Sequence, residues 1–151
     1  MPNWCYNRIT IYGDEKTEAK LKELEEIFES KQPFTEIYAI PDFKNIPNEK
    51  GELPKLEQRL NPDGSIFYET YNFPDGTNDD RWYHWCISHW GTKWEPDMAG
   101  IEYEDSEILA LTFSTAWSPP EGIVEKLREK YPELSFSCFY DEPGCEIAGY
   151  Y

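Results

Sequence analysis

The stretch Arg81-Trp82-Tyr83-His84-Trp85-Cys86-Ile87-Ser88-His89-Trp90-Gly91-Thr92-Lys93-Trp94 decides how the rest of the chain is interpreted. It holds four of the six tryptophans and both histidines of a 151-residue chain. Residues 77–80, just before it, offer a capping side chain and acids for a first helical turn. Gly91 is a natural stop, because glycine takes the left-handed conformation after a helix without penalty. We therefore predict a helix over about residues 79–90, with one face formed by Trp82, Trp85, Cys86 and His89.

The segments outside this helix alternate between strand and helix patterns. Residues 4–12 alternate as a strand does, with Cys5, Ile9 and Ile11 on one side. A helix follows to about Ser30. Beyond the tryptophans the pattern predicts a hairpin over 98–103 and 108–115, a helix capped by Ser118, and strands over 134–140 and 145–151.

The region between the first helix and the tryptophans is less regular. Residues 34–40 form a short apolar run, which predicts either a strand or a packed loop. Residues 41–79 are rich in proline, asparagine, aspartate and glycine, which are turn formers. Between two such turns, residues 65–73 are compatible with one arm of a hairpin.

Without the irregular region the order is β-α-β-β-α-β, the ferredoxin-like split βαβ plan of an α+β protein. We expect a single domain over 1–151, with two helices on one face of an antiparallel sheet. An insertion at about 41–96 carries the tryptophan-rich helix. The other face of the sheet is expected to be open unless the insertion covers it.

Charge and composition exclude several classes of function. The net charge of −16 disfavours direct binding to nucleic acid or to an anionic membrane. Residues 94–151 contain 3 Lys/Arg against 13 Asp/Glu. The chain has neither a signal-peptide pattern nor an apolar run near 18 residues, so we expect a cytoplasmic location. The four cysteines form no CxxC pair and are interpreted as free thiols, with no cofactor implied.

Four separated motifs carry a family resemblance. They are Met-Pro-Asn-Trp-Cys-x-Asn at 1–7, Trp-Gly-Thr-Lys-Trp at 90–94, Thr-Ala-Trp-Ser-Pro-Pro at 115–120 and Tyr-x-Glu-Pro-Gly at 140–144. In this order they resemble the YubB-like ferredoxin-domain family of phage and conjugative-plasmid proteins. The resemblance implies a ferredoxin-like fold, a mobile-element origin in a host-cell cytoplasm and no established activity. The cysteine spacing would not hold an iron–sulfur cluster.

The tryptophan stretch also suggests a ligand pocket. Its walls would be Trp90, Trp94 and Trp117, and Lys93 with the amides of Gly91 and Thr92 would attract an anionic or aromatic ligand such as a nucleotide. Asn7 completes the predicted pocket. The competing and favoured interpretation is that these rings simply form the core, because buried aromatic rings dominate packing energetics.

The acidic residues suggest a second kind of site. A carboxylate surface could imitate a phosphate track and occupy a partner's basic groove; its members would be Glu95, Asp97, Glu102, Glu104, Asp105 and Glu107. The competing explanation is solubility and protection of sheet edges. Cys86 and His89 have a spacing that can chelate a metal, but we predict no metal site, since buried cysteines commonly serve as small apolar residues.

No nucleophile-elbow or phosphate-loop pattern occurs in the chain. A cysteine–histidine pair using Cys86 is disfavoured, because Cys86 and His84 face apart on a helix. We therefore expect a non-catalytic binding module that acts on a host or defence protein through its acidic surface. The alternatives are a protein that sequesters a nucleotide-like molecule and an unrecognised hydrolase. The oligomeric state is left open.

Overall fold

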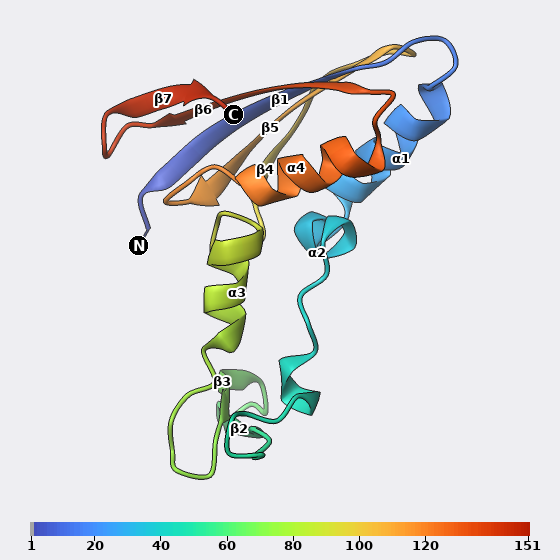
Figure 1. Ribbon diagram of the computed structural model, residues 1–151. Coiled ribbons are helices and arrows are strands. Elements are labelled where there is room, and N and C mark those ends of the chain that lie inside the picture. The colour runs from blue at the N-terminus through green and yellow to red at the C-terminus, as the bar shows by residue number, and fades with distance from the viewer. Residues whose placement is uncertain (1) are drawn as a thin grey trace. The chain divides into compact units, whose positions relative to one another are not determined.

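The computed structural model of the protein describes residues 2–151 (Figure 1). The chain forms two compact units. The larger unit contains the residues up to Ala39 together with Cys86–Tyr151, and the smaller unit contains Ile40–Trp85. Along the described chain, no helix has the length and apolarity that crossing a membrane requires.

The larger unit is built on a five-stranded antiparallel sheet with strand order β4-β5-β1-β6-β7. The central strand β1 pairs with β5 on one side and with β6 on the other, so that Arg8 lies between Thr112 and Phe139. The strands are β1 Trp4–Tyr12, β4 Asp97–Glu104, β5 Ile108–Ala116, β6 Ser135–Glu142 and β7 Ile147–Tyr150.

Helices α1 (Glu18–Glu29) and α4 (Glu121–Lys130) lie on the same face of this sheet (Figure 1). Their apolar stripes are buried because leucine, isoleucine and valine recur at helical spacing. The core beneath them includes Leu24, Phe28, Ile123 and Leu127 from the helices and Cys5, Ile9, Leu111 and Phe113 from the strands. Apart from the extra edge strand β7, the order β-α-β-β-α-β and the pairing are those of a ferredoxin-like sheet. The predicted α+β fold is confirmed.

The smaller unit contains a separate two-stranded sheet of β2 (Lys55–Leu60) and β3 (Ile66–Asn72). A short 3₁₀ helix, Phe43–Asn45, precedes it. The predicted hairpin arm is therefore a strand. The tryptophan-rich helix is α3, Arg81–His89, and Gly91 follows it at φ 87°, as predicted for its stop.

Two local predictions were wrong, and each was overridden by a distant residue. Residues 34–40 were expected to be a strand or loop, but Pro33–Ile37 forms helix α2. The Glu95 carboxylate accepts hydrogen bonds from the N–H groups of Phe34 and Thr35 at 2.8 and 2.9 Å. These two N–H groups belong to the first turn, where a helix provides no partner of its own. Helix α4 begins at Glu121, so its N-cap position is Pro120, which has no capping side chain. Ser118, the predicted cap, lies two residues earlier, and its hydroxyl donates to Gly91 O at 2.5 Å.

The predicted apolar face of the tryptophan helix is only partly buried. Cys86 is buried, whereas Trp82 is exposed and Trp85 and His89 are intermediate. The fully buried tryptophan is Trp90, which lies just beyond the last helical turn. The packing role assigned to the helix thus falls mainly on the turn that follows it.

Candidate functional site

The turn after α3 is packed directly against the start of α4. Gly91 has no room for a side chain, since a Cβ there would lie 3.0 Å from Glu121 N and 3.1 Å from Pro119 O. Gly122 N donates to Trp90 O at 3.0 Å. The Trp-Gly-Thr bend is therefore a structural joint between these two segments of the larger unit.

Three residues of the predicted ligand pocket lie in the interior. The Trp90 indole donates to Tyr38 O at 2.8 Å, and its ring meets the edge of Phe34 with centroids 5.6 Å apart. The Thr92 hydroxyl donates to Ala116 O at 2.9 Å. Asn7 donates to Cys5 O and to Thr115 Oγ1 at 3.1 and 2.9 Å, and accepts from the Tyr151 hydroxyl at 2.8 Å. The polar atoms named here serve internal contacts.

The other members of the predicted pocket lie nearer the surface. Trp94 and Trp117 are exposed. The Lys93 ammonium stands 4.3 Å from the centroid of the Trp94 ring, a cation–π contact. Trp117 has φ 70°, and its N–H donates to Asn3 O at 2.9 Å. The nucleotide-pocket hypothesis therefore depends on Lys93, Trp94 and Trp117.

The six acidic residues expected to form one partner surface have separate roles. Glu95 binds the first turn of α2, as described above. The Asp105 carboxylate accepts hydrogen bonds from the Tyr103 hydroxyl and from the N–H groups of Glu107 and Ile108, at 2.7–2.8 Å. These bonds stabilise the β4–β5 turn. Glu102 forms an ion pair with Arg8 at 3.1 Å. Asp97, Glu104 and Glu107 are exposed.

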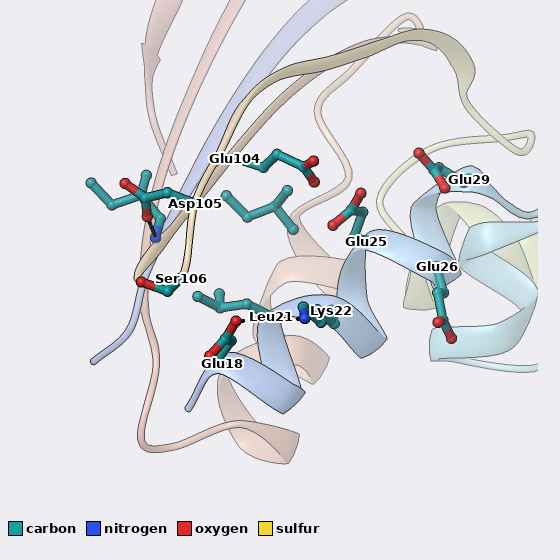
Figure 2. Close-up of a pocket in the computed structure, with 11 residues that line it drawn as sticks. Glu18, Leu21, Lys22, Glu25, Glu26, Glu29, Glu104, Asp105 and Ser106 are labelled. Atoms are coloured by element: carbon teal, nitrogen blue, oxygen red, sulfur yellow. Dashed lines mark hydrogen bonds and ion pairs between the residues drawn. The ribbon is translucent and has the colours of Figure 1, made fainter. Parts of the chain in front are cut away.

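Glu104 belongs to an acidic cleft of about 580 Å³ between α1 and the β4–β5 turn (Figure 2). Its carboxylate and that of Glu25 point toward each other. The hydrogen bond between the two carboxyls, followed by burial and by the charges of Glu104, Glu29 and Glu26, raises the pKa of Glu25 to about 7. Glu25 therefore keeps its proton at moderately acidic pH, in a hydrogen bond with the carboxyl of Glu104.

The face of the larger sheet opposite α1 and α4 carries a different kind of surface, which we call the open face. It consists of exposed side chains that alternate with the core residues of the same strands. Tyr6 is 54 % exposed, Phe139 38 % and Tyr150 78 %. Around these rings lie the side chains of Arg8, Glu102, Thr112 and Asp141.

The open face contains two adjoining hollows. One, of about 430 Å³, is lined by Tyr6, Arg8, Phe139 and Asp141 among others. The second, of about 320 Å³, is lined by Arg8, Phe139 and Tyr150 together with Thr10 and Ser137. Arg8 and Phe139 border both hollows because β1 and β6 place them directly opposite each other. The rings of Phe139 and Tyr150 meet edge to face, 5.2 Å apart.

A signal for the open face was present in the sequence. Tyr6, Arg8 and Tyr12 alternate with the buried residues of β1, which indicates a strand with one covered face. The neighbours from β6 and β7 could not be predicted, because they are set by the pairing register.

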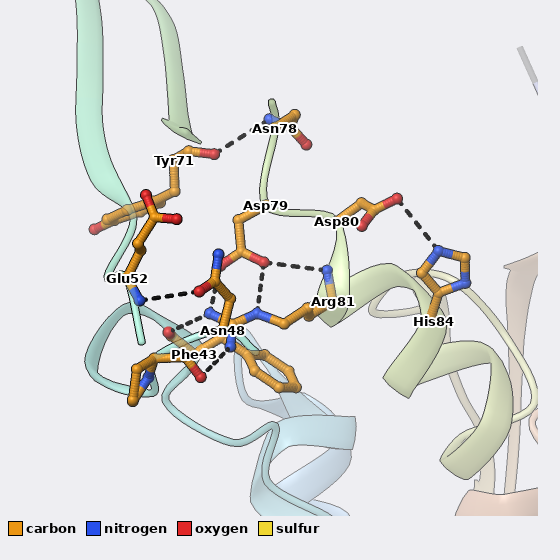
Figure 3. Close-up of polar contacts among 10 residues, drawn as sticks. Phe43, Asn48, Glu52, Tyr71, Asn78, Asp79, Asp80, Arg81 and His84 are labelled. Atoms are coloured by element: carbon orange, nitrogen blue, oxygen red, sulfur yellow. Dashed lines mark hydrogen bonds and ion pairs between the residues drawn. The ribbon is translucent and has the colours of Figure 1, made fainter. Parts of the chain in front are cut away.

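In the smaller unit the most connected polar group is Arg81 (Figure 3). Its guanidinium binds both oxygens of Asp79, at 2.8 and 2.9 Å, and Phe43 O at 2.8 Å. It also stacks near the rings of Phe43 and Phe73, 5.1 and 5.3 Å from their centroids. The hydrogen bonds from Arg81 lower the pKa of the buried Asp79 carboxyl. This cluster joins three segments of the unit and is interpreted as structural.

The thiols are poorly suited to nucleophilic chemistry. Burial raises the pKa of Cys5, Cys86 and Cys138 to about 11, so these thiols are protonated at neutral pH. Cys145 is exposed, and its hydrogen bond with Glu142 raises its pKa as well. Within residues 2–151 no group of three or more histidine, cysteine, aspartate or glutamate side chains is placed to hold a metal ion.

Taken together, the sheet order and the uncovered sheet face define a ferredoxin-like α+β protein with an aromatic surface and no metal cluster among its described residues. Residues 89–151 match the family model described as "Ferredoxin-like domain in Api92-like protein". The chain is also similar in fold to the crystal structure of protein api92 from Yersinia pseudotuberculosis, with a TM-score of 0.55 and 11% sequence identity. That similarity covers 99% of this chain and 93% of the other. No protein with a curated description matches the sequence.

Proposed function

We propose that this protein is a non-catalytic binding module whose open face binds a basic, arginine- or lysine-containing segment of another protein. The observation that carries the proposal is the group of exposed aromatic rings around Arg8 on the sheet face opposite the two helices. Isolated exposed apolar side chains are normal on a protein, but a contiguous group lining adjoining hollows is typical of an interaction site.

The residue types of the open face support protein binding. Tyrosine, phenylalanine and arginine are enriched in protein–protein interfaces, and tyrosine and arginine are among the residue types that supply most of the binding energy. Tyr6, Phe139 and Tyr150 offer ring faces to a cation, and Asp141 and Glu102 offer carboxylates at the edge of the same surface. Arginine side chains fit this combination, because a guanidinium both stacks on rings and binds carboxylates.

The charge of the chain favours a basic partner. With a net charge of −16, the protein attracts cationic segments and repels nucleic acid. The partner we propose is a host or defence protein met by a phage or plasmid product, as the YubB-like resemblance suggests. This keeps the expected class of function but moves the binding surface from the six acidic residues to the open face.

The proposal is tested by titrating isotope-labelled protein with a short arginine- and lysine-rich peptide while recording amide NMR spectra. An acidic peptide of equal length is the control ligand. We expect shifts in β1, β6 and β7 that weaken as salt is raised, since exposed charges are screened. The double variant Tyr6→Ala, Phe139→Ala should lose them, and Trp82→Ala, which removes an exposed ring elsewhere, should not.

Other outcomes separate the alternatives. If neither peptide moves the β1 and β6 resonances, the proposal is wrong. If nucleotides instead quench tryptophan fluorescence and Lys93→Ala abolishes the quenching, the nucleotide-pocket hypothesis is favoured. Turnover of a substrate would favour the hydrolase.

A further inference from the structure

Four side chains meet at the larger hollow of the open face, two from β1 and two from β6. Tyr6 lies directly opposite Asp141, and Arg8 lies directly opposite Phe139. The two rings therefore occupy one diagonal of this group, and the two charged side chains occupy the other. Diagonal neighbours lie about 7–8 Å apart and directly opposite ones closer, so both rings and the carboxylate are within reach of one small bound group.

The two charged members of this group differ in their partners. The Arg8 guanidinium is 3.1 Å from the carboxylate of Glu102, a residue of β4. Because β5 lies between β1 and β4, these two side chains meet over β5, and the Arg8 side chain extends away from β6. No lysine or arginine within residues 2–151 forms an ion pair with Asp141. The β6 side of the hollow therefore presents a carboxylate that an external cation can bind.

The Phe139 ring is supported on the side of β7. Tyr150 lies opposite Phe139, and their rings meet edge to face with centroids 5.2 Å apart. The Phe139 ring is still 38 % exposed, and the cation–π contacts of the described residues do not involve it. A ring that is already held by a neighbour loses less freedom when it binds a ligand. Its exposed surface is thus suited to a cation supplied by another molecule.

Arginine fits this combination of groups better than lysine does. A guanidinium is planar and weakly hydrated, and its N–H donors form a fixed fork, so it can stack on a ring and bind a carboxylate together. The lysine ammonium is a compact, strongly hydrated point charge and lacks this fork. A surface that combines exposed rings with a carboxylate therefore favours arginine.

We propose that this part of the open face is an arginine subsite. The inference rests on the proposed function and names the side chain that the open face selects in its basic partner. The partner's guanidinium stacks on Phe139, contacts Tyr6 and binds the Asp141 carboxylate. Glu102 is a positioning residue, because its ion pair holds the Arg8 guanidinium over β5. Without that ion pair Arg8 can turn toward Asp141, since diagonal neighbours are within reach of long side chains.

Two peptides of equal length and equal charge test the subsite, one with arginine as its basic residue and the other with lysine at the same positions. Amide NMR titration of the isotope-labelled full chain measures both dissociation constants. We expect the arginine peptide to bind at least about threefold more tightly, which is the effect of one cation–π contact at an exposed site. The largest shifts should lie in β1 and β6.

Variants of the subsite residues should remove this preference. Phe139→Leu keeps an apolar side chain without a ring, so it should bring the two dissociation constants close together. Asp141→Asn should weaken the arginine peptide more than the lysine peptide, because only a guanidinium donates two parallel hydrogen bonds to a carboxylate. Asp97→Asn is the matched control, since it removes the same charge from β4 and should weaken both peptides equally. The amide spectrum of each variant checks that it is folded.

A double-mutant cycle tests the positioning role of Glu102. Glu102→Gln releases Arg8, which then competes for Asp141, so the arginine peptide should bind at least about threefold more weakly, as coupled neighbouring residues allow. In a chain with Arg8→Met, the same change should have a smaller effect, because methionine carries no competing charge. An equal loss in both chains would mean that Glu102 acts only through its own charge, and would overturn the positioning role.

The peptide titrations also separate this proposal from the function on which it rests. If both peptides shift the β1 and β6 resonances with equal affinity, the arginine subsite is wrong, while binding of basic segments by the open face is supported. If the arginine peptide is preferred but shifts resonances outside the open face, the subsite is again wrong. If neither peptide binds, the proposed function fails and the subsite fails with it.

Discussion

Strands of similar sequence pattern occur in both units, yet they are stabilised very differently. In β1 the apolar positions Ile9 and Ile11 are fully buried beneath α1 and α4. In β2 the apolar position Leu60 is 60 % exposed, although it too alternates with charged residues. Alternation therefore specifies a strand in both places but stabilises only the one whose apolar face is covered.

The same contrast separates structural from interaction surfaces. The larger unit covers one face of its sheet and leaves the other, with Tyr6 and Phe139, exposed. In the smaller unit all of β2 and the first four residues of β3 are exposed. Exposed aromatic residues on a stable sheet suit a binding role, whereas exposed apolar residues on a two-stranded hairpin leave that hairpin only marginally stable.

The largest expected effect comes from removing a core ring of the larger unit. Phe113 packs against Phe28 and Phe34 with centroids 6.1 and 5.9 Å apart, so Phe113→Ala should lower the free energy of unfolding by about 3–5 kcal/mol. Leu60→Ala in the hairpin should cost less than about 0.5 kcal/mol. Chemical denaturation of both variants measures the difference, and similar losses at the two positions would contradict the comparison.

Arg81 tests whether the smaller unit depends on one polar cluster. Arg81→Met removes the hydrogen bonds to Asp79 and leaves its buried carboxylate without that partner, so the unit should lose about 2 kcal/mol of local stability. Hydrogen exchange should show faster exchange at the Asp79 amide and unchanged exchange in β1. Arg59→Met, on an exposed arginine of the same unit, is the control and should change neither. Faster exchange in both units would mean that they unfold together.

Two glycines with the same backbone angle allow a matched comparison of turns. Gly91 and Gly64 both have φ 87°, a conformation that costs a residue with a side chain about 1–2 kcal/mol. A Cβ at Gly91 would also press on Glu121 N, whereas nothing lies within 4 Å of a Cβ at Gly64. Gly91→Ala should therefore lower the melting temperature more than Gly64→Ala does. Equal shifts in melting temperature would show that the packing of this turn against α4 adjusts to the added side chain at little cost.

The sequence contained enough local information to predict the fold of the larger unit. The spacing of apolar residues in 4–12 and 18–29 indicates which side of each element is buried, and the helices and the sheet bury those sides. What could not be predicted depends on partners far along the chain. Helix α2 forms where the Glu95 carboxylate accepts hydrogen bonds from its first turn. Ser118 was expected to cap α4, but its hydroxyl donates to Gly91 O instead. Neither partner is visible in a local pattern.

The candidate sites were predicted less well than the fold, for a related reason. Trp90 and Thr92 are adjacent to Lys93 and Trp94, but the turn sends the first pair inward and leaves Trp94 exposed. The sequence indicates which residues belong to a turn, but it does not indicate which of their side chains pack into the core. Likewise, acids that are neighbours in sequence, such as Glu102 and Asp105, take part in unrelated contacts.

The smallest expected effect concerns the pH dependence of the acidic cleft, which has no counterpart in the near-neutral hairpin. The pKa of Glu25 is raised from 4.5 to about 7 chiefly by its hydrogen bond with Glu104, so the folded state binds this proton more tightly than the unfolded state does. The stabilisation from protonated Glu25 is complete below pH 4.5 and is lost as pH rises to about 7. Glu25→Gln keeps a neutral hydrogen-bonding group there, so it should match the unmodified protein at pH 4.5 and exceed it at pH 8. Since the site is open to solvent, the gain in stability from Glu25→Gln should be no more than about 1 kcal/mol.

Thermal unfolding across this pH range measures that gain. Glu26→Gln is the control, because the charge of Glu26 contributes least to the raised pKa of Glu25. A constant difference between Glu25→Gln and the unmodified protein at every pH would mean that the pKa of Glu25 is not raised in the folded state.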